Sequence, residues 1–280
     1  MGAPGIPPMS LRGLAYNAPM RNRFAPVLGV ALWVAASMAN AQATVVLKLQ
    51  PKAGSSYKYS LVNETSAQGA PQKMKMTMSQ TIKVTSVSGG KVTIETSTNN
   101  VKGEGMPAST SDELSKIKVT NVMDSYGKVV SSKATGHPMA EAMASSLGGT
   151  GFAGVEYPRK AVGVGATWKG TIDLAKMLEA SGLKTGGNKM TVNYKLVKIE
   201  KQGAKTVATI EQTFSGSATA QPPAGTQGGA LNLSMRGKST ITVDVADGMM
   251  LSTRGEVTTS IKSGTQFNMT STTTTTSKRV

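Results

Sequence analysis

The feature that most constrains the fold is a period of two in the apolar residues, which recurs along most of the chain after residue 44. Apolar side chains alternate with Lys, Ser or Thr, as in Tyr57, Tyr59 and Leu61. Successive side chains of a β-strand point to opposite faces, so this pattern predicts antiparallel strands with one buried and one wet face. The other alternating segments lie at 45–49, 74–78, 92–94, 192–196, 231–235 and 241–245, and turn signals with glycine at 88–90, 125–127, 202–203, 247–248 and 263–264 separate the runs.

Two short segments have a helical period instead. Residues 137–147 place apolar side chains on one helical face, with Pro138 in the first turn, and residues 173–181 do the same after Asp173. The sequence therefore predicts an α+β, mostly β fold. In it, a long curved antiparallel sheet, half-barrel-like, has one or two short helices packed on its concave face.

The first 41 residues have the pattern of an export signal. Arg21 and Arg23 precede an apolar stretch at 24–36 that is too short to span a bilayer, and small residues follow. Ala39 and Ala41 have the spacing of a cleavage site, which predicts cleavage after Ala41. We expect a periplasmic or extracellular protein in which residues 1–41 are the N-terminal extension and signal peptide, and residues 42–280 form one β-rich domain.

That domain is also predicted to contain two related halves, 42–136 and 158–280. Each half has a Gly-x-x-aromatic motif, which begins at Gly54 in the first half and at Gly165 in the second. Each then has long alternating segments, a hairpin at glycine, and a turn in which glycine follows aspartate. Similar segments at a fixed order are the sequence sign of a duplication, although meandering β-chains also resemble one another by composition.

Two motifs resemble a group of uncharacterised secreted bacterial proteins. They are Tyr157-Pro-Arg-Lys-x-Val-x-Val-Gly-x-Thr-Trp168 and Gly54-x-x-Tyr57-x-Tyr59. The resemblance implies a shape similar to the folds of lipoprotein carriers and lipoprotein-localisation proteins, in which helices lie against the concave face of a curved antiparallel sheet. It implies no activity and no catalytic residues.

Few residues are available for catalysis or metal binding. The chain has no cysteine and a single histidine, His137, which lies before a proline at a predicted helix start. Disulfides, thiolate sites and a Ser-His-Asp arrangement are therefore not expected. We expect no cofactor, no metal and no enzymatic activity.

Methionine is the most informative residue type, with 17 in the chain, three of them at alternate positions of one predicted strand. These three, with methionines of the predicted helices and nearby aromatic residues, are the predicted lining of a ligand site. The set is Met74, Met76, Met78, Met139, Met143, Met177, Tyr57, Tyr59 and Trp168. A Cu(I) thioether site and an ordinary methionine-packed core are the alternatives.

The leading hypothesis is non-catalytic binding of an apolar or amphiphilic, lipid-like molecule in this interior, where basic rims would favour an anionic head group. The net charge of +16 supports an alternative, a structural or adhesive envelope protein with a basic face for anionic partners. An enzyme of unfamiliar type is the third hypothesis. Nucleic acid is not an expected partner, because the lysines are scattered and lack interleaved aromatic residues. No apolar run of the mature chain is long enough for a transmembrane helix.

Overall fold

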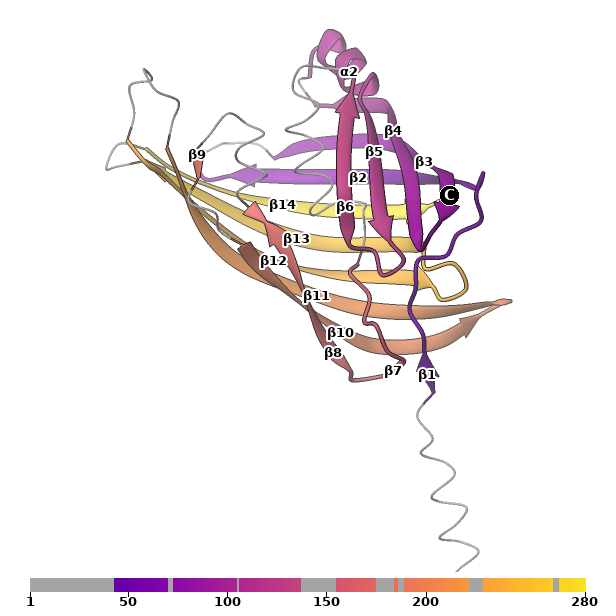
Figure 1. Cartoon of the computed structure of the whole chain (residues 1–280). Coiled ribbons are helices and arrows are strands. Elements are labelled where there is room, and N and C mark those ends of the chain that lie inside the picture. Colours follow the sequence, from indigo (N-terminus) through magenta and orange to yellow (C-terminus); the bar gives the residue numbers. More distant parts are fainter. Residues whose placement is uncertain are drawn as a thin grey trace, which may run out of the picture. The chain divides into compact units, whose positions relative to one another are not determined.

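The computed structural model describes residues 43–69, 73–104, 106–136, 155–174, 184–185, 189–221, 229–263 and 267–280. Ala43–Val280 is one compact unit. Within the described residues its main element is a twelve-stranded antiparallel sheet in the order β6-β5-β4-β3-β2-β14-β13-β12-β11-β10-β8, with β9 (Lys184–Thr185) paired separately to β11 (Figure 1). The bounds are β2 Ser56–Ala67, β3 Met74–Ser88, β4 Lys91–Gly103, β5 Lys118–Asp124, β6 Val129–Thr135, β8 Thr167–Asp173, β10 Lys189–Gln202, β11 Lys205–Gln221, β12 Leu231–Asp244, β13 Met250–Ser263 and β14 Phe267–Arg279.

The period of two produces these strands, and the prediction of a mostly β, antiparallel fold is confirmed. On β2, Tyr57, Tyr59 and Leu61 are buried, whereas Lys58 and Ser60 between them are exposed. The same alternation of buried and exposed positions recurs on β10 and β11. We call the face that carries the buried residues the inner face and the other the outer face. β6 and β8 are the two edges of the sheet, which is open.

The alternating segment 45–49 differs from the prediction of a strand. Only β1 (Thr44–Val45) pairs, with β7 (Val162–Gly163), and the residues that follow are irregular although Leu47 and Leu49 are buried. Their backbone instead bonds two separate turns. The amide of Leu49 donates to Ser125 O at 2.8 Å, and the amide of Gln50 donates to Asp247 O at 2.9 Å. Residues 46–50 therefore cross the sheet instead of joining it, and the alternation reflects that only one side of this segment is buried. We call it the first crossing segment.

A second crossing segment, 155–157, bonds the same two turns. The amide of Tyr157 donates to Tyr126 O at 2.7 Å, and its hydroxyl donates to Gly248 O at 2.7 Å. Residues 124–127 join β5 to β6, and residues 244–248 join β12 to β13. The two crossing segments therefore tie together turns that are more than a hundred residues apart in sequence.

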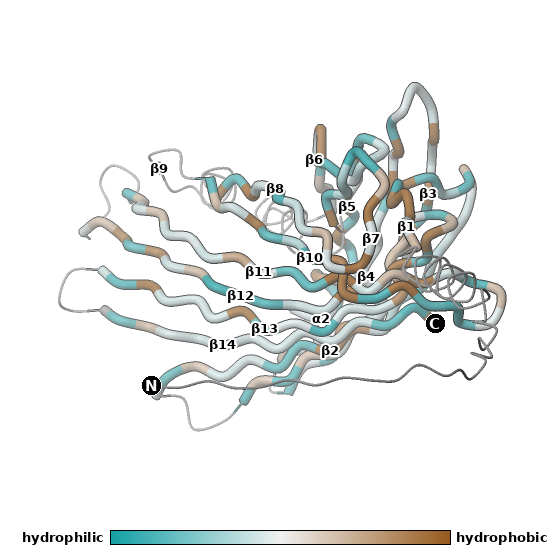
Figure 2. The backbone as a smooth tube through the Cα atoms, turned by 90° about the horizontal axis from the view of Figure 1, so that it is seen from below, coloured by the Kyte–Doolittle hydropathy of each residue, from teal (hydrophilic) through white to brown (hydrophobic). Residues whose placement is uncertain are grey.

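The core lies at the end of the strands where these segments cross. We call this region the packed end. Figure 2 shows hydrophobic colour gathered around β1, β4 and β7, while the opposite ends of β11 to β14 are paler or hydrophilic. Fully buried side chains at the packed end include Leu47, Tyr59, Val84, Leu196 and Ile210. Farther along β2, β3, β12, β13 and β14 the inner face is only half-buried, as on β12 before Ile241, whereas inward residues of β10 and β11 such as Met190 and Ala218 stay buried.

The strand order repeats within the sheet. β2 to β6 form one antiparallel meander, and β8 with β10 to β13 form another, while β14 pairs between β2 and β13. In both meanders a glycine turn joins the second and third strands, and a turn that begins at aspartate joins the fourth and fifth. The duplication stays a prediction, and this shared order supports it.

The two predicted helices lie outside the described residues, apart from Asp173 and Leu174. The described part of the chain has a different helix, α2 (Ala108–Ser115), between β4 and β5. Ser111 Oγ donates to Val101 O, which holds α2 to β4, and Leu114 packs on a small separate cluster that includes Ile117. The sequence did not indicate α2 because a single large apolar side chain in eight residues produces no period.

The crossing segments predict an unequal response of two glycines. Gly248 has φ of 69°, and a Cβ there would collide with the carbonyl oxygen of Lys48, whereas Gly203, with φ of 60°, has open space around it. Replacing Gly203 with Ala should lower the free energy of unfolding by about 1–2 kcal/mol, the cost of a left-handed alanine. Gly248→Ala should cost about 3 kcal/mol or more, because the crossing segment must also move. Urea unfolding measures both, and equal losses would contradict the crossing contact.

Candidate functional site

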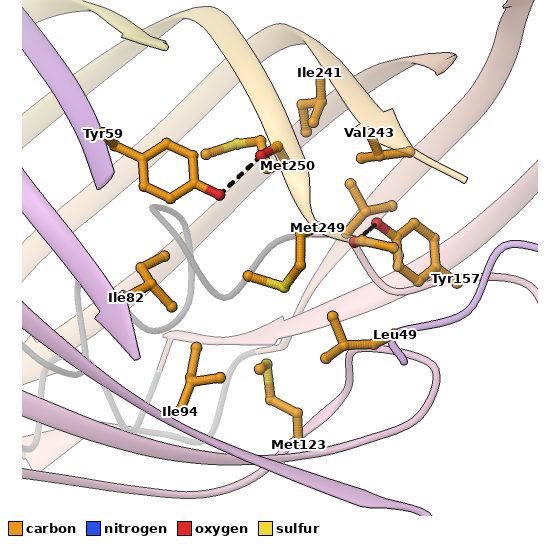
Figure 3. Close-up of a pocket in the computed structure, with 12 residues that line it drawn as sticks. Leu49, Tyr59, Ile82, Ile94, Met123, Tyr157, Ile241, Val243, Met249 and Met250 are labelled. Carbon is orange, nitrogen blue, oxygen red and sulfur yellow. Dashed lines mark hydrogen bonds between the residues drawn. The ribbon is translucent and has the colours of Figure 1, made fainter. Parts of the chain in front are cut away.

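The packed end encloses one small cavity. It is lined from several strands and both crossing segments by Leu49, Tyr59, Ile82, Ile94, Met123, Val155, Tyr157, Ile241, Val243, Gly248, Met249 and Met250 (Figure 3). Its volume is about 20 Å³, close to the minimum that holds one water molecule. The side chains therefore fill this end of the sheet, and a lipid chain has no room here.

The buried tyrosines of the packed end act as hydrogen-bond donors. Tyr59 donates to Met250 O at 2.8 Å, and Tyr157 donates to Gly248 O (Figure 3). Burial raises the pKa of Tyr59 and of Tyr157, and burial also raises the pKa of Tyr194 to about 12. These hydroxyls therefore remain protonated near neutral pH, and their role is to satisfy buried carbonyls rather than to exchange protons with a substrate.

A charged group lies at the margin of the packed end, where β2 begins and β14 ends. The Arg279 guanidinium lies 4.3 Å from the centre of the Tyr57 ring, and its Nη1 lies 3.9 Å from Asp247 Oδ2. Tyr57 donates to the same Asp247 oxygen at 3.1 Å. Burial, then the charge of Asp247, raises the pKa of Tyr57. The group joins β2, β14 and the turn before β13, which is a structural connection between the two meanders.

The inner face continues beyond the packed end on the same strands. The register of β2, β3, β12, β13 and β14 is continuous through this region, so the residues that continue the buried positions can be assigned. We call them the distal inner face: Asn63, Thr65, Met74, Met76, Met78, Leu233, Met235, Val257, Thr259, Ile261, Ser271, Thr273 and Thr275. All are half-buried except Met74, which is 60% exposed.

The distal inner face has an amphipathic layout across the strands. Hydroxyl side chains occupy its centre on β14 and β2, where Thr65 Oγ1 and Thr273 Oγ1 lie 3.0 Å apart. The methionines of β3 border this stripe on one side, and Val257, Ile261 and Leu233 border it on the other. No member of the distal inner face carries a charge. Apart from Arg279 at the packed end of β14, the described charges of the same strands lie on the outer face, as in the Lys75–Glu64 ion pair at 3.6 Å.

The residues of the predicted ligand lining fall in three places. Tyr57 and Tyr59 belong to the packed end, whereas Met74, Met76 and Met78 belong to the distal inner face. Trp168 lies on the edge strand β8, where it stacks on Tyr194 with ring centres 5.5 Å apart. Met139, Met143 and Met177 lie outside the described residues. The sequence did not indicate the crossing segments, because an irregular segment with one buried side can have the same alternating pattern as a strand.

Metal binding has no further support in the described ranges. There, no three His, Cys, Asp or Glu side chains are grouped closely enough to hold a metal ion. Met74, Met76 and Met78 follow one another along one strand, which separates successive positions by nearly 7 Å. No helix in the described part of the chain is both long and apolar enough to cross a membrane.

Comparison with known proteins adds no family. No protein-family model matches the chain, and no curated protein matches it.

The buried tyrosines predict a pH dependence of stability. Because burial raises the pKa of Tyr157 above its ordinary value of 10.0, its stabilising effect is complete below pH 10 and is lost as pH rises further, when only the unfolded state ionises. Tyr157→Phe should cost about 1–2 kcal/mol at neutral pH through the unpaired Gly248 carbonyl. Above about pH 10 the free energy of unfolding of the Tyr157→Phe variant should fall less steeply with pH than that of the wild type. The two slopes should differ by about 1.4 kcal/mol per pH unit. Parallel stability curves from urea unfolding across this range would contradict the assignment.

Proposed function

We propose that the protein binds a lipid-like amphiphile, without catalysing a reaction, on the distal inner face. The observation that carries the proposal is that one face of the sheet is buried at the packed end and continues, still apolar at its borders, as half-buried side chains. Met76, Met78 and Met235 contribute to these borders. A contiguous, partly exposed apolar surface is a common mark of a binding site.

The chemistry of the borders suits an acyl chain. Methionine is unbranched and polarisable, so it adapts to apolar ligands of variable shape. At the packed end the cavity is too small for such a chain, so in this proposal the chain lies on the distal inner face. The proposal includes the finer fold expected from the sequence, in which a half-barrel-like sheet carries helices from 137–147 and 173–181 over this face.

The proposal also includes export by the signal at 1–41 and function in the periplasm or outside the cell. The resemblance to uncharacterised secreted bacterial proteins, with their carrier-like shape, supports the same place of action. A carrier of lipid between membranes needs a sheltered apolar surface and no reactive groups, which agrees with the residues on the distal inner face.

The test compares an inward with an outward substitution on β3. Met76→Lys places a charge on the distal inner face, whereas Thr77→Lys places the same charge on the outer face of the same strand. The melting temperature of delipidated wild-type protein should rise by several degrees when a lipid extract is added. A ligand present at about a hundred times its Kd adds about 2.7 kcal/mol to the free energy of unfolding. Thr77→Lys should retain the gain and Met76→Lys should lose it. Absence of any shift in the wild type with extracts of neutral and anionic lipids would sink the proposal.

The outer face supports the second candidate, a structural or adhesive role toward anionic envelope surfaces. Arg236, Lys238 and Lys262 are exposed there on neighbouring strands, and an open hollow of about 480 Å³ beside Arg236 is lined by serine and threonine side chains. Binding of the delipidated protein to anionic vesicles that disappears at high salt, with an unchanged melting temperature in lipid extract, would favour this role over the first.

A further inference from the structure

Within the described residues, four buried polar atoms on the inner faces of β2, β3 and β14 lack hydrogen-bond partners. They are Gln80 Oε1 on β3, Asn63 Oδ1 on β2, and Ser277 Oγ and Arg279 Nη1 on β14, and the side chains of Gln80 and Ser277 are only 2% and 1% exposed. Buried polar groups in folded proteins are almost always paired, and leaving one unpaired is destabilising. Four such atoms on three adjacent strands point to a partner that the described part of the chain does not supply.

The register places all four where the packed end meets the distal inner face. Gln80 and Arg279 flank Tyr59 on its two sides, Ser277 lies opposite Leu61, and Asn63 is two residues farther along β2. With strands about 4.8 Å apart and about 3.3 Å per residue, the four positions extend over roughly 12–14 Å. A single water molecule or small ion does not span that length, but a head group with several hydroxyls does.

The unpaired atoms also define the chemistry of the partner. The two amide oxygens can only accept hydrogen bonds, and a serine hydroxyl can accept or donate, so the partner must carry hydrogen-bond donors. Arg279 Nη1 can only donate, so the partner must carry acceptors as well, and a hydroxyl group serves as both. Asp247, 3.9 Å from this nitrogen, is already the counter-ion of Arg279, and no residue of the distal inner face is charged, so a charged partner would have no counter-ion of its own. Burying an unpaired charge costs far more than burying a neutral hydroxyl.

Met78 covers the approach to this region. Its Sδ lies 3.9 Å from Gln80 Nε2, and Met78 is the next inward residue toward the distal inner face. Gln80 Nε2 also has a long bond of 3.4 Å to Thr98 Oγ1. The cover is therefore a flexible thioether held by weak contacts, which a ligand can displace without moving the backbone.

From these observations we propose that Gln80, Asn63 and Ser277 form the head-group site for a neutral, polyhydroxylated amphiphile, such as a glycolipid, whose chain lies along the methionines of β3. This inference rests on the proposed function and specifies its ligand class. It differs from the anionic head group expected from the sequence, because the distal inner face is uncharged and Arg279, the basic residue on the inner face of β14, already has Asp247 as its counter-ion.

The experiment uses two soluble probes with one alkyl chain and different heads. Decyl maltoside carries many hydroxyl donors, and decylphosphocholine carries none. Titration calorimetry below the micelle concentration, on delipidated full-length mature protein, should give at least about tenfold tighter binding of the maltoside, since each hydrogen bond contributes about fivefold. Gln80→Leu and Ser277→Ala should each reduce maltoside affinity about fivefold and leave decylphosphocholine affinity unchanged.

The control is Thr276→Ala, which removes an exposed hydroxyl from the outer face beside Ser277 and should change neither affinity. Equal wild-type affinity for the two probes, as expected if a water molecule satisfies the cluster, would overturn the head-group site and leave amphiphile binding intact. Binding of neither probe would overturn both proposals.

The melting temperatures of the free variants give a second, independent readout. If the Gln80 oxygen pairs only with a ligand, it is unpaired and destabilising in the free protein. The Gln80→Leu variant should therefore melt at the wild-type temperature or above it. A marked fall would show that Gln80 stabilises the fold through its own contacts and would count against the site.

Discussion

The structure depends on the contact of two crossing segments with two turns. Residues 48–50 and 155–157 donate backbone and side-chain hydrogen bonds to the turns at 124–127 and 244–248, which belong to different meanders. An open sheet with long strands has no closed core of its own. By inserting Leu49 and Tyr157 between the turns, the crossing segments provide the second layer that the inner face needs at that end.

This one-sided packing explains the uneven burial of the strands. Where the crossing segments lie, side chains from both meanders meet and leave a cavity of about 20 Å³. A few residues farther along β2, β3, β12, β13 and β14, the inward positions are half-buried, and methionine, serine and threonine join the aliphatic residues there. The candidate site is thus a continuation of the core surface, so the same strands that build the stable end also present the binding face.

The polar atoms at the boundary connect stability with the proposed binding. Unpaired Gln80 and Ser277 lower stability where leucine and alanine would not, and hydrogen bonds to a head group would recover that loss on binding. The outer face has the opposite character, with lysines and arginines in water and ion pairs such as Lys198–Glu200. The sheet therefore separates a neutral distal inner face from a basic outer face.

The sequence by itself determined the strands, their inward positions and most turns, because a period of two requires only that neighbouring side chains point to opposite faces. It also identified Met74, Met76 and Met78 as sharing a face. Only the tertiary structure decided that residues 46–50 cross the sheet instead of joining it, and that Tyr57 and Tyr59 pack in a core separate from those methionines. It alone brought Gln80 near Ser277, almost two hundred residues away in sequence. Alternation encodes which side of a strand is apolar but not what covers it, and that covering depends on contacts between distant segments.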